Sequence, residues 1–443
     1  MPMEKKGWWL PSLFVQMRKV CFFTIGCKLN QYETQAISEG LEKLGFQRVN
    51  FGEKADLYLI NTCTVTAQSD RSARQTIYRA KRFSPNAKIV VVGCYAQTEE
   101  EVLKTLPGVS LVVKNENKEE ILRKITRLFD GDSLIENKIP LLNQIEVSGH
   151  TKHTRGLVKI QDGCNQACSY CIVPLARGPE KSRRLDSILS EIGNLDKNGF
   201  REVVLTGVHI GRYDFEGINL HQLLDEILKR TQIKRVRLSS IEPKEIADEL
   251  IDLASNNDKI CRHFHIPLQS GDDYILSRMN RNYTTGEYAE LLDKIIKKIP
   301  DCLVGADVMV GFPEELESNF QNSLDFVLSQ PINYLHVFSY SDRKGTVASK
   351  LPDKIPPHVI KKRNKLFREL GYKKWVNFIE KFIGKKLGVL IEKRRDKKTG
   401  KLTGLSDNYI RVLIDGEDRW MNQLVEVEIT RREGRVLVGE FVG

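Results

Sequence analysis

The sequence predicts an α/β protein with an N-terminal parallel-sheet domain, a partial (β/α)6 barrel and a small C-terminal antiparallel β-barrel. Apolar, β-branched runs alternate with helix-like stretches through most of the chain, and six such units follow Arg155. Residues 381–443 instead contain short β-rich runs without helices. A chain of 443 residues also exceeds one ordinary core, at about 150 residues per domain.

Composition excludes several classes of protein. Hydrophobic residues make up 41%, charged residues 29%, and only 15 residues are proline, which rules out a collagen-like or wholly disordered chain. No apolar stretch approaches the roughly 18 to 20 residues that cross a bilayer, so we expect no membrane-spanning segment. The apolar run 7–17 follows two lysines like a signal peptide, but it contains Pro11 and lacks a small-residue cleavage site. We interpret residues 1–16 as an N-terminal extension, with Met17 as an alternative start.

Charge and cysteine content favour a polyanionic partner and reduced thiols. The chain has 69 Lys and Arg against 58 Asp and Glu, a formal net charge of +11. Its nine cysteines are an odd number in a sequence without an export signal, which favours reduced thiols or metal ligands over a disulfide framework. We therefore expect a cytoplasmic protein that does not act at a membrane.

The N-terminal domain, residues 18–135, repeats one pattern three times: an apolar run ends in a cysteine and a helix-like stretch follows. The runs are VCFFTIGC (20–27), DLYLINTC (56–63) and KIVVVGC (88–94), and the helical stretches are 30–44, 69–83 and 98–106. This alternation predicts a parallel sheet whose carboxyl edge carries Cys27, Cys63 and Cys94, the edge where open α/β sheets bind ligands. Taken singly, each would more often be a buried thiol. Residues 131–152 lose the periodicity, and we interpret them as a linker or peripheral segment.

The central domain, residues 150–380, contains a second series of strand-like runs, and nearly every run is followed by a helical stretch. The runs are 157–161, 202–208, 235–239, 263–268, 303–310 and 334–340, and the clearest helical stretches are 186–198, 318–329 and 357–382. Six βα units are two fewer than a closed eightfold barrel contains. The series therefore predicts a partial barrel with its site at the carboxyl ends of the strands.

The C-terminal domain, residues 381–443, contains β-rich runs separated by turn signals such as Thr399-Gly400 and Asp415-Gly416. The runs are 387–392, 409–414, 424–430 and 435–441, which predict a small antiparallel barrel. The domain holds 14 Lys and Arg against 10 Asp and Glu. Six basic residues lie close together: Lys393, Arg394, Arg395, Lys397, Lys398 and Lys401. A solvated hairpin and a nucleic-acid contact both explain this basic hairpin.

The strongest chemical signal is the spacing CxxxCxxC, formed by Cys164, Cys168 and Cys171 directly after the first barrel strand. Three thiolates on one loop can bind three irons of a [4Fe-4S] cluster and leave the fourth iron open to a substrate or cofactor. Structural zinc is the alternative, but it needs four ligands and usually paired CxxC motifs, and no fourth ligand is evident nearby. Three other cysteines are interpreted as ordinary thiols: Cys21, Cys261 and Cys302.

This motif at the end of the first strand of a partial barrel resembles the radical S-adenosylmethionine superfamily. The resemblance implies that the open iron chelates S-adenosylmethionine and that one electron from the cluster releases a 5′-deoxyadenosyl radical. Tyr170, just before the last cysteine, would lie by the adenine, although packing over the loop explains it equally well. The three cysteines of the N-terminal domain indicate a second [4Fe-4S] cluster, also with an open iron.

The order of the three domains resembles the methylthiotransferases of that superfamily, whose last domain is called TRAM and binds RNA. Seven motifs look most like the enzymes that modify threonylcarbamoyladenosine in tRNA: GCKLNQYET (26–34), NTCTVT (61–66), GCYAQ (93–97), CIVPLARG (171–178), SSIEP (239–243), HIPLQSG (265–271) and YSDRKGT (340–346). The resemblance implies insertion of a methylthio group at C2 of the adenine beside the anticodon. One S-adenosylmethionine would methylate a sulfur on the second cluster, and another would yield the radical. The implied partners are tRNA, an electron donor and a sulfur source.

Two loops depart from the usual motifs of this group. The family usually has Gly-Phe-Pro-Gly-Glu after the fifth barrel strand, whereas this chain has Glu314 in place of the second glycine. It also usually has Gly-Thr-Pro-Ala where Val347 replaces the proline here. Because glycine and proline restrict or widen the allowed backbone angles, the paths of these two loops stay open at this point.

Two further groups of residues are predicted from their positions near the carboxyl ends of the barrel strands. The candidates for binding S-adenosylmethionine are Gly207, Glu242, Gln269, Gly271 and Gly311, each of which could instead be a turn residue. The candidates for contacts with RNA phosphates or a substrate carboxylate are Arg177, Arg183, Arg184 and Arg343, with a solvated surface role as the alternative.

Three rival functions remain at this point. The same chemistry could act on isopentenyladenosine in tRNA, or on an aspartate of a ribosomal protein, for which an acidic C-terminal domain would be expected. A non-catalytic iron–sulfur protein that binds RNA or transfers electrons is the rival of another class. An electron carrier normally has every iron ligated, which the CxxxCxxC motif does not provide.

Overall fold

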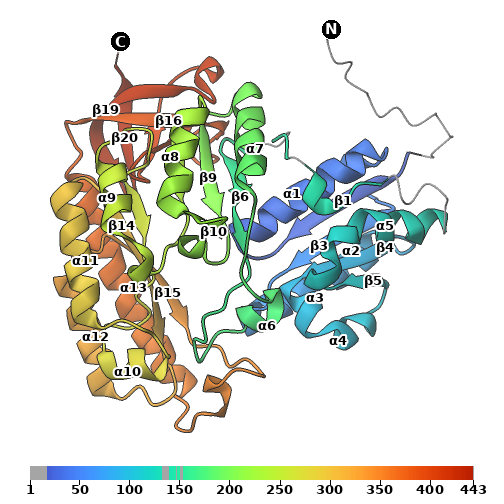
Figure 1. The fold of residues 1–443 in the computed structure, drawn as a ribbon, viewed down its shortest axis with the longest axis horizontal. Helices are drawn as coiled ribbons and strands as arrows, with labels where there is room; N and C mark the ends of the chain where they lie inside the picture. The colour runs from blue at the N-terminus through green and yellow to red at the C-terminus, as the bar shows by residue number, and fades with distance from the viewer. Residues whose placement is uncertain (1–16, 132–138, 146, 150–152, 443) are drawn as a thin grey trace.

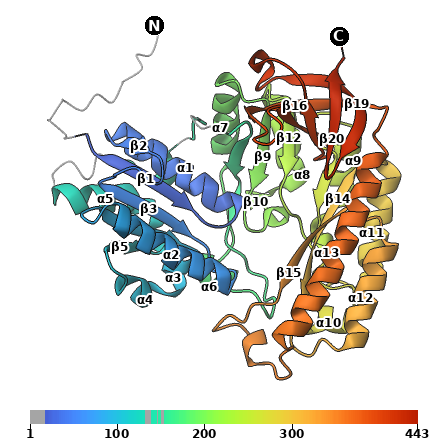
Figure 2. The ribbon, with the colours of Figure 1, turned by 180° about the vertical axis from the view of Figure 1, so that it is seen from behind.

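The computed structural model describes residues 17–131, 139–145, 147–149 and 153–442, which form three regions (Figures 1 and 2). They contain a five-stranded N-terminal sheet, two three-stranded sheets in the centre and a closed five-stranded barrel at the C-terminus. Among the described helices, none has both the length and the apolar character required to cross a membrane. The extension predicted at residues 1–16 lies outside the described residues.

The N-terminal sheet is parallel throughout and has the strand order β2-β1-β3-β4-β5. Its strands are β1 (Lys19–Thr24), β2 (Gln47–Val49), β3 (Leu57–Thr62), β4 (Lys88–Gly93) and β5 (Val109–Val113). The three predicted strands form its centre. The two edge strands are missing from the sequence prediction because β2 has only three residues and β5 is only partly buried.

Helices cover both faces of this sheet (Figure 1). One face packs against α1 and α5 through Ile37, Leu41 and Leu122, and the other packs against α2, α3 and α4 through Ile77 and Tyr95. The helices are α1 (Lys28–Lys43), α2 (Ala67–Phe83), α3 (Cys94–Thr98), α4 (Glu100–Lys104), the 3-10 helix η1 (Asn115–Glu120) and α5 (Ile121–Asp130).

The described part of segment 131–152 is not a detached linker. Ile139, Ile145 and Val147 are buried in the same apolar cluster as α1 and α5, and a short 3-10 helix, η3 (Leu142–Gln144), lies between them. The backbone N–H and the hydroxyl of Ser148 both donate to Glu39 Oε2 at 2.7 Å. The apolar residues of this segment follow neither helical nor strand spacing, so periodicity alone does not reveal their burial.

The central region contains the predicted six parallel strands, in the order β6-β9-β12 and then β13-β14-β15. The two sheets meet at a bridge between Val236 and Ile260, which completes a partial barrel. The strands are β6 (Gly156–Lys159), β9 (Glu202–Thr206), β12 (Arg235–Leu238), β13 (His263–His265), β14 (Leu303–Val310) and β15 (Tyr334–Ser339). The outer helices are α7 (Leu185–Lys197), α8 (Leu220–Arg230), α9 (Asp248–Ser255), α11 (Thr285–Lys298), α12 (Glu317–Ser329) and α13 (Pro357–Glu380).

Shorter elements of the central region lie in its connecting loops. They are the pairs β7 (Gln161–Asp162) with β8 (Lys181–Ser182) and β10 (Asp214–Phe215) with β11 (Ile218–Asn219), the helices α6 (Val173–Arg177) and α10 (Asp273–Arg278), and the 3-10 helices η4 (Ile210–Arg212), η5 (Pro243–Glu245) and η6 (Ala348–Lys350). Side-chain caps mark several helix starts, because Asn219, Asp272 and Thr284 each accept a backbone N–H of the first turn.

The C-terminal region is a closed barrel with the order β16-β17-β18-β20-β19. Its elements are β16 (Lys386–Arg395), β17 (Leu402–Ser406), β18 (Arg411–Ile414), the 3-10 helix η7 (Asp418–Trp420), β19 (Leu424–Glu433) and β20 (Val436–Phe441). The barrel is mostly antiparallel, as predicted, but β18 and β20 pair in parallel. The strand β17 is also missing from the prediction, because the run LTGLS is short and contains a glycine in its middle.

The C-terminal barrel packs at the amino ends of the central strands. Arg235 and Arg237 of β12 donate to the carbonyl oxygens of Gly388 and Ser406, at 2.6 and 3.0 Å. Arg262, directly before β13, forms an ion pair with a carboxylate of the β17–β18 turn at 2.6 Å. The carboxyl ends of the same strands lie at the opposite end of the partial barrel, where a site is expected.

Candidate functional site

The first set of cysteines lies on the loop between β7 and α6, beyond the carboxyl end of β6. Cys164, Cys168 and Cys171 are all partly buried and none forms a disulfide. The loop begins at Gly163, whose φ is +73°, and a Cβ at this position would lie 2.0 Å from the Pro179 carbonyl oxygen. Only glycine therefore fits where the chain leaves the strand and turns into the loop.

Each sulfur of this set receives a hydrogen bond from the protein or lies beside a donor. The backbone N–H two residues further on donates to Cys164 Sγ and to Cys171 Sγ, both at 3.4 Å, and Arg281 donates to Cys168 Sγ at 3.3 Å. Burial raises the pKa of Cys171 to about 12 and also raises the pKa of Cys168. Donors that point at sulfur suit cluster-bound thiolates, so this donor set fits a three-ligand [4Fe-4S] site.

The second set lies at the carboxyl edge of the N-terminal sheet, as predicted. Cys27 precedes α1, Cys63 follows β3 and Cys94 begins α3. A Cβ on Gly26 would lie 2.9 Å from the Cβ of Cys63, which places the first two loops in contact. Gly93 has a φ of +97°, and a Cβ there would lie 2.3 Å from a backbone oxygen of β3. The parallel sheet thus brings three loops from distant parts of the sequence to one edge.

The sulfurs of the second set have one donor and one acceptor beside them. The backbone N–H of Val65 donates to Cys63 Sγ at 3.5 Å, and Cys27 Sγ lies 3.6 Å from Asn30 Oδ1. Burial raises the pKa of Cys63 to about 11 and raises the pKa of Cys94 as well. Three thiols at one strand edge, without a fourth cysteine among the described residues there, fit a second cluster held by three ligands.

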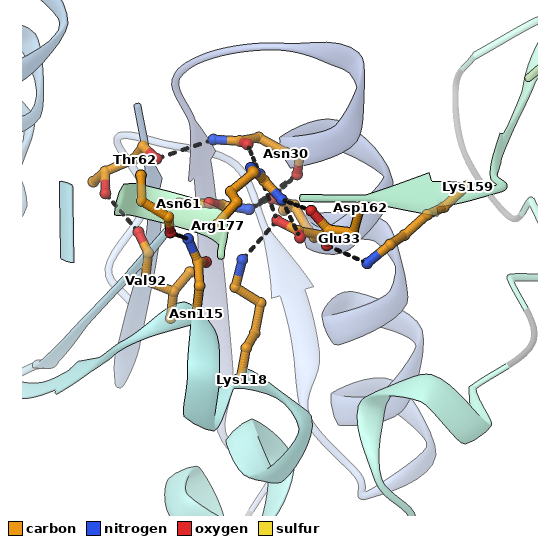
Figure 3. Close-up of polar contacts among 12 residues, drawn as sticks. Asn30, Glu33, Asn61, Thr62, Val92, Asn115, Lys118, Lys159, Asp162 and Arg177 are labelled. Carbon is orange, nitrogen blue, oxygen red and sulfur yellow. Dashed lines mark hydrogen bonds and ion pairs between the residues drawn. The ribbon is translucent and has the colours of Figure 1, made fainter. Parts of the chain in front are cut away.

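Figure 3 shows a buried ionic network. It reaches the second set through Asn30, whose Oδ1 lies 3.6 Å from Cys27 Sγ. Arg177, the last residue of α6, is 3% exposed, and its Nη1 donates to Glu33 Oε1 and Asp162 Oδ1, both at 3.0 Å. Its Nη2 donates to Asn30 Oδ1 at 2.6 Å, and Lys118 contacts Glu33 Oε2 at 2.8 Å. Burial raises the pKa of Glu33, but the positive charges of Arg177 and Lys118 lower it by more, so the pKa is about 2. The network therefore holds Glu33 ionised in the interior.

The structure corrects part of the prediction for the four arginines. Arg177 is buried in this network and is not available to RNA or to a substrate. Arg183 forms an ion pair with a carboxylate of α7 at 2.5 Å, and Arg343 contacts Asp70 of α2 at 2.6 Å, so both have structural partners. Arg184 is exposed and lies over an aromatic ring. The carboxylates Glu33 and Asp70, which bind Arg177 and Arg343, lie 144 and 273 residues away in the sequence, so these two pairings are invisible to motif analysis.

The glycines predicted near S-adenosylmethionine lie at strand carboxyl ends and also have steric roles. Gly311 has a φ of +77°, and a Cβ there would lie 2.4 Å from Ile360 of α13. A Cβ on Gly271 would lie 2.8 Å from Phe326 of α12. A Cβ on Gly207 would lie 2.8 Å from a backbone oxygen of β7. Close packing therefore explains glycine at all three positions.

The other three candidates make specific contacts in the same area. Tyr170 packs against a small apolar cluster that includes Phe312, which accounts for it as a packing residue. Glu242 forms an ion pair with Arg281, and burial raises the pKa of Glu242. Gln269 has a φ of +65°, and its backbone N–H donates to a carbonyl oxygen of β14 at 2.8 Å. These contacts leave a role in binding S-adenosylmethionine as a proposal.

The basic hairpin of the C-terminal barrel divides into exposed and paired residues. Arg394, Lys397 and Lys398 are exposed, and the Nε of Arg394 lies 4.0 Å from a carboxylate oxygen of Glu392. Arg395 pairs with a carboxylate of η7 at 2.7 Å, and Lys401 pairs with the side chain of Asp415 at 2.6 Å. The ammonium of Lys393 lies 4.5 Å from the centre of an aromatic ring at the end of the α7–β9 loop. The exposed residues are the ones that remain available to a polyanion.

Two family models match the chain. One is described as an uncharacterized protein family, UPF0004, and covers residues 19–114, and the other is the radical SAM superfamily, which covers residues 158–327. Both ranges agree with the two cysteine sites.

Full-length relatives extend this match. The chain is 40% identical over 408 residues to the threonylcarbamoyladenosine tRNA methylthiotransferase MtaB of Aquifex aeolicus (strain VF5), covering 90% of this chain and 97% of that one. It is 36% identical over 436 residues to the MtaB enzyme of Bacillus subtilis (strain 168), covering 96% and 97%. The chain belongs to the radical S-adenosylmethionine methylthiotransferase family. A tRNA-2-methylthio-N(6)-dimethylallyladenosine synthase of Cereibacter sphaeroides (strain ATCC 17023) is 31% identical over 97% of this chain and 99% of its own.

A solved structure shows the same fold at low sequence identity. A radical S-adenosylmethionine methyltransferase, TsrM of Kitasatospora setae, solved with cobalamin and a [4Fe-4S] cluster, matches with a TM-score of 0.54 and 16% identity. The match covers 73% of this chain and 75% of that one.

Family membership decides the chemistry that the sequence motifs predict. The methylthiotransferase is an enzyme, a transferase that uses S-adenosylmethionine and a [4Fe-4S] cluster in its radical domain and carries a second cluster. Both cysteine sets fit this requirement, because each offers three sulfurs on one loop or at one sheet edge. N–H groups donate to the sulfurs of Cys63, Cys164, Cys168 and Cys171. The zinc alternative and the non-catalytic iron–sulfur alternative therefore lose their support.

The two departures from the usual motifs keep the backbone that the usual residues would adopt. Glu314, which replaces a glycine, has a φ of +68°, and its carboxylate accepts from Arg278 at 2.6 and 2.9 Å. Val347, which replaces a proline, has a φ of −63°, the value that a proline ring imposes. These φ angles are ones that glycine and proline readily adopt, and Arg278 pairs with the side chain that stands in the left-handed region.

Sequence reasoning missed several polar residues around the first cluster site. His209 lies 3.6 Å from Cys164 Sγ and 2.9 Å from Glu180 Oε1, and these three groups are close enough to hold a metal ion. Arg281 contacts both Cys168 and Glu242. The available signal was the place of His209 just beyond the end of β9. Arg281 carries no such signal.

A second polar group crosses three neighbouring strands of the central region. His265 Nε2 and His336 Nδ1 lie 2.9 and 3.2 Å from the same oxygen of Asp307. Burial raises the pKa of Asp307, but these two histidines lower it below its ordinary value. The three donor atoms could hold a metal ion, although the hydrogen bonds already satisfy Asp307.

Proposed function

We propose that this methylthiotransferase converts threonylcarbamoyladenosine beside the anticodon of tRNA to its 2-methylthio derivative. The observation that carries this proposal is the identity of 36–40% with two relatives named for this substrate, against 31% with the relative named for dimethylallyladenosine. The structure supports it with two three-cysteine sites, one in each of the two matched regions.

The reaction requires radical chemistry because the C2–H bond of adenine is neither acidic nor attached to a leaving group. The clusters and S-adenosylmethionine would supply the radical, the methyl group and a place for the inserted sulfur. The protein's own residues position these groups. Gly163 and Gly93 shape the loops that carry the cysteines, and Arg281 holds Cys168 and Glu242 together at the mouth of the barrel.

The binding site for S-adenosylmethionine follows from position. We propose that it lies at the carboxyl ends of the barrel strands, next to the loop that carries Cys164. The residues proposed there are Tyr170, Gly207, Glu242, Gln269, Gly271 and Gly311. Their support is the placement of all six beyond strands or on the cysteine loop, at the end of the barrel away from the C-terminal region.

The C-terminal region, residues 381–443, is proposed to be a TRAM-like domain that binds tRNA. Its exposed cations Arg394, Lys397 and Lys398 suit phosphates, and Arg184 of the central region is a further exposed candidate. We propose that the enzyme acts in the cytoplasm, and action on tRNA together with reduced cysteines supports this location. Turnover also needs an external electron donor and a sulfur source.

Nucleoside mass spectrometry tests the substrate. The enzyme, reconstituted with both clusters and given S-adenosylmethionine, a reductant and sulfide, is expected to methylthiolate tRNA that carries threonylcarbamoyladenosine. It should leave tRNA with isopentenyladenosine and the ribosomal protein almost unchanged. Methylthio-isopentenyladenosine as the main product, or a modified protein without an RNA product, would assign the chain to a different subfamily.

Salt dependence tests the RNA contact. If Arg394, Lys397 and Lys398 contact phosphates, their replacement by Ala should weaken tRNA binding. The slope of the logarithm of the binding constant against the logarithm of the salt concentration should become shallower by about 0.7 to 0.9 per lost contact. Arg395 and Lys401 serve as the matched control. Their ion pairs with carboxylates should reduce their contribution to phosphate binding. Cleavage of S-adenosylmethionine without RNA should survive in both variants. An unchanged slope in the triple variant would make the hairpin a solvated surface.

A further inference from the structure

The helix α6 connects the two cysteine sites physically. It begins two residues after Cys171, and its five residues pack against α3, whose first residue is Cys94. The Nδ2 of Asn115 in η1 donates to the carbonyl oxygen of Ala176 at 2.6 Å, which fastens the end of α6 to the N-terminal region. The last residue of α6, Arg177, therefore comes from the radical domain but contacts Asn30 and Glu33 of α1, the helix that follows Cys27 (Figure 3).

Arg177 is held in one orientation by four hydrogen bonds. Its guanidinium contacts both oxygens of Glu33, at 3.0 and 3.4 Å, together with Asp162 at 3.0 Å and Asn30 at 2.6 Å. Asn30 cannot turn freely, because its Nδ2 donates to the carbonyl oxygens of Ile25 and Thr62, both at 3.0 Å. The same Oδ1 that accepts from Arg177 lies 3.6 Å from Cys27 Sγ.

The network around Arg177 contains more positive than negative charge. Two carboxylates, Glu33 and Asp162, meet three cations, Arg177, Lys118 and Lys159. Glu33, Lys118 and Arg177 are 4%, 7% and 3% exposed, so water screens their charges little, whereas Asp162 and Lys159 are 24% and 27% exposed and pair with each other. The deeply buried groups are thus two cations and one carboxylate. A surplus cation in such a place is costly unless an anion lies nearby. The thiolates of the second cluster are anionic groups that it could serve, since Asn30 Oδ1 lies 2.6 Å from Arg177 Nη2 and 3.6 Å from Cys27 Sγ, and α6 packs against α3, which begins at Cys94.

We propose that Arg177, held by Glu33 and Asn30, is a positioning residue that sets the reduction potential of the second cluster from the radical domain. A fixed positive charge beside a cluster stabilises its reduced form, which carries one more negative charge, and so raises the reduction potential. Because Arg177 is attached to the loop of the radical cluster through α6, the potential of one site depends on the folding of the other domain.

Redox titration of the second cluster alone tests this proposal. In the full chain with Cys164, Cys168 and Cys171 replaced by Ala, only the second cluster is loaded, and its midpoint potential is followed by electron paramagnetic resonance. Arg177→Gln is expected to shift the potential to a more negative value. Glu33→Gln, which removes a negative charge and keeps Arg177, is expected to shift it to a less negative value. The double variant should return close to the parent chain.

Opposite shifts from two neighbouring residues separate charge from structural damage. Loss of packing would alter the potential in the same direction in both variants or would lower the iron content. Arg237→Gln is the matched control, because Arg237 is a buried arginine that pairs with Glu202 at the opposite end of the barrel and should leave the measured potential unchanged. An unchanged potential in both Arg177→Gln and Glu33→Gln at full iron content overturns the proposal. If Arg177→Gln does not fold, two other variants decide the question. Glu33→Gln should shift the potential to a less negative value, and Lys118→Met should shift it to a more negative value. The result is independent of which tRNA is the substrate.

Discussion

The two cluster sites offer the same donor set but are built in opposite ways. Cys164, Cys168 and Cys171 share one loop, so they are close in space because they are close in the sequence. The second set comes from three loops, and only the parallel order of β1, β3 and β4 brings Cys27 and Cys94 to one edge. A site on one loop depends on local backbone geometry, whereas a site at a sheet edge depends on the register of a whole domain.

The surroundings sharpen this contrast. The buried arginine of the first site, Arg281, comes from the same domain as its cysteines, and it contacts Cys168 directly. The buried arginine of the second site, Arg177, comes from the other domain and reaches Cys27 through Asn30. The first site is therefore complete within the barrel, and the second is complete only when both domains are in place.

Removal of each cysteine set should have the largest effect and should separate the sites completely. Replacement of Cys164, Cys168 and Cys171 by Ala should remove half of the iron and abolish cleavage of S-adenosylmethionine, because the radical cluster is lost. Replacement of Cys27, Cys63 and Cys94 by Ala should also remove half of the iron but leave cleavage of S-adenosylmethionine intact. Iron analysis and assay of 5′-deoxyadenosine measure both. Zinc in the wild-type protein, or a single cluster, would contradict the two-site description.

Substitution of one glycine should damage one site and spare the other. Gly163→Ala places a Cβ 2.0 Å from the Pro179 carbonyl oxygen, and Gly93→Ala places one 2.3 Å from a backbone oxygen of β3. The strained φ alone costs about 1 to 3 kcal/mol, and the clash with backbone adds to it. Gly163→Ala should lower only the iron of the radical site, and Gly93→Ala only that of the second site. Thermal unfolding and iron content check this.

A matched pair of glycines without such contacts provides the control. Gly217 and Gly400 also have positive φ, but a Cβ there would meet nothing within 4 Å. Their Ala variants should lose about 1 kcal/mol from backbone strain and keep the full iron content. Equal losses of iron in all four variants would mean that backbone strain, not the place beside the cysteines, controls cluster binding.

The smallest expected effect concerns the pH dependence of stability through Glu33. Its folded-state pKa of about 2 lies below its value in the unfolded chain, about 4.3, so its contribution is complete above that value and is lost as the pH falls towards 2. Between pH 7 and pH 3.5 the iron-free wild type should lose about 1 kcal/mol more free energy of unfolding than Glu33→Gln. Urea unfolding at the two pH values measures the difference. An identical loss in the two proteins would mean that Arg177 and Lys118 do not hold the Glu33 charge in the folded state.

Much of the architecture follows from the sequence. Alternation of apolar and helical segments predicts the parallel sheet, the six-stranded partial barrel and the closed C-terminal barrel, because periodicity records which side of each element is buried. It misses β2 and β17, which are short or interrupted by glycine, and the parallel pair of β18 and β20, because the direction of pairing within a small barrel leaves no periodic trace. The burial of Ile139 and Val147 is missed because the apolar residues of their segment follow neither helical nor strand spacing.

The sequence alone predicts the two sets of cysteines. The polar and charged groups that surround each set are decided only by the tertiary structure. Spacing on a loop and repetition at strand ends are local features, so Cys27 and Cys164 can be predicted as members of two cysteine sets before any coordinates exist. The role of Arg177 cannot, because Glu33 lies 144 residues away and only the packing of α6 on the N-terminal domain brings them together. A buried charge is decided by the groups that surround it in space, and the sequence does not order those groups by distance.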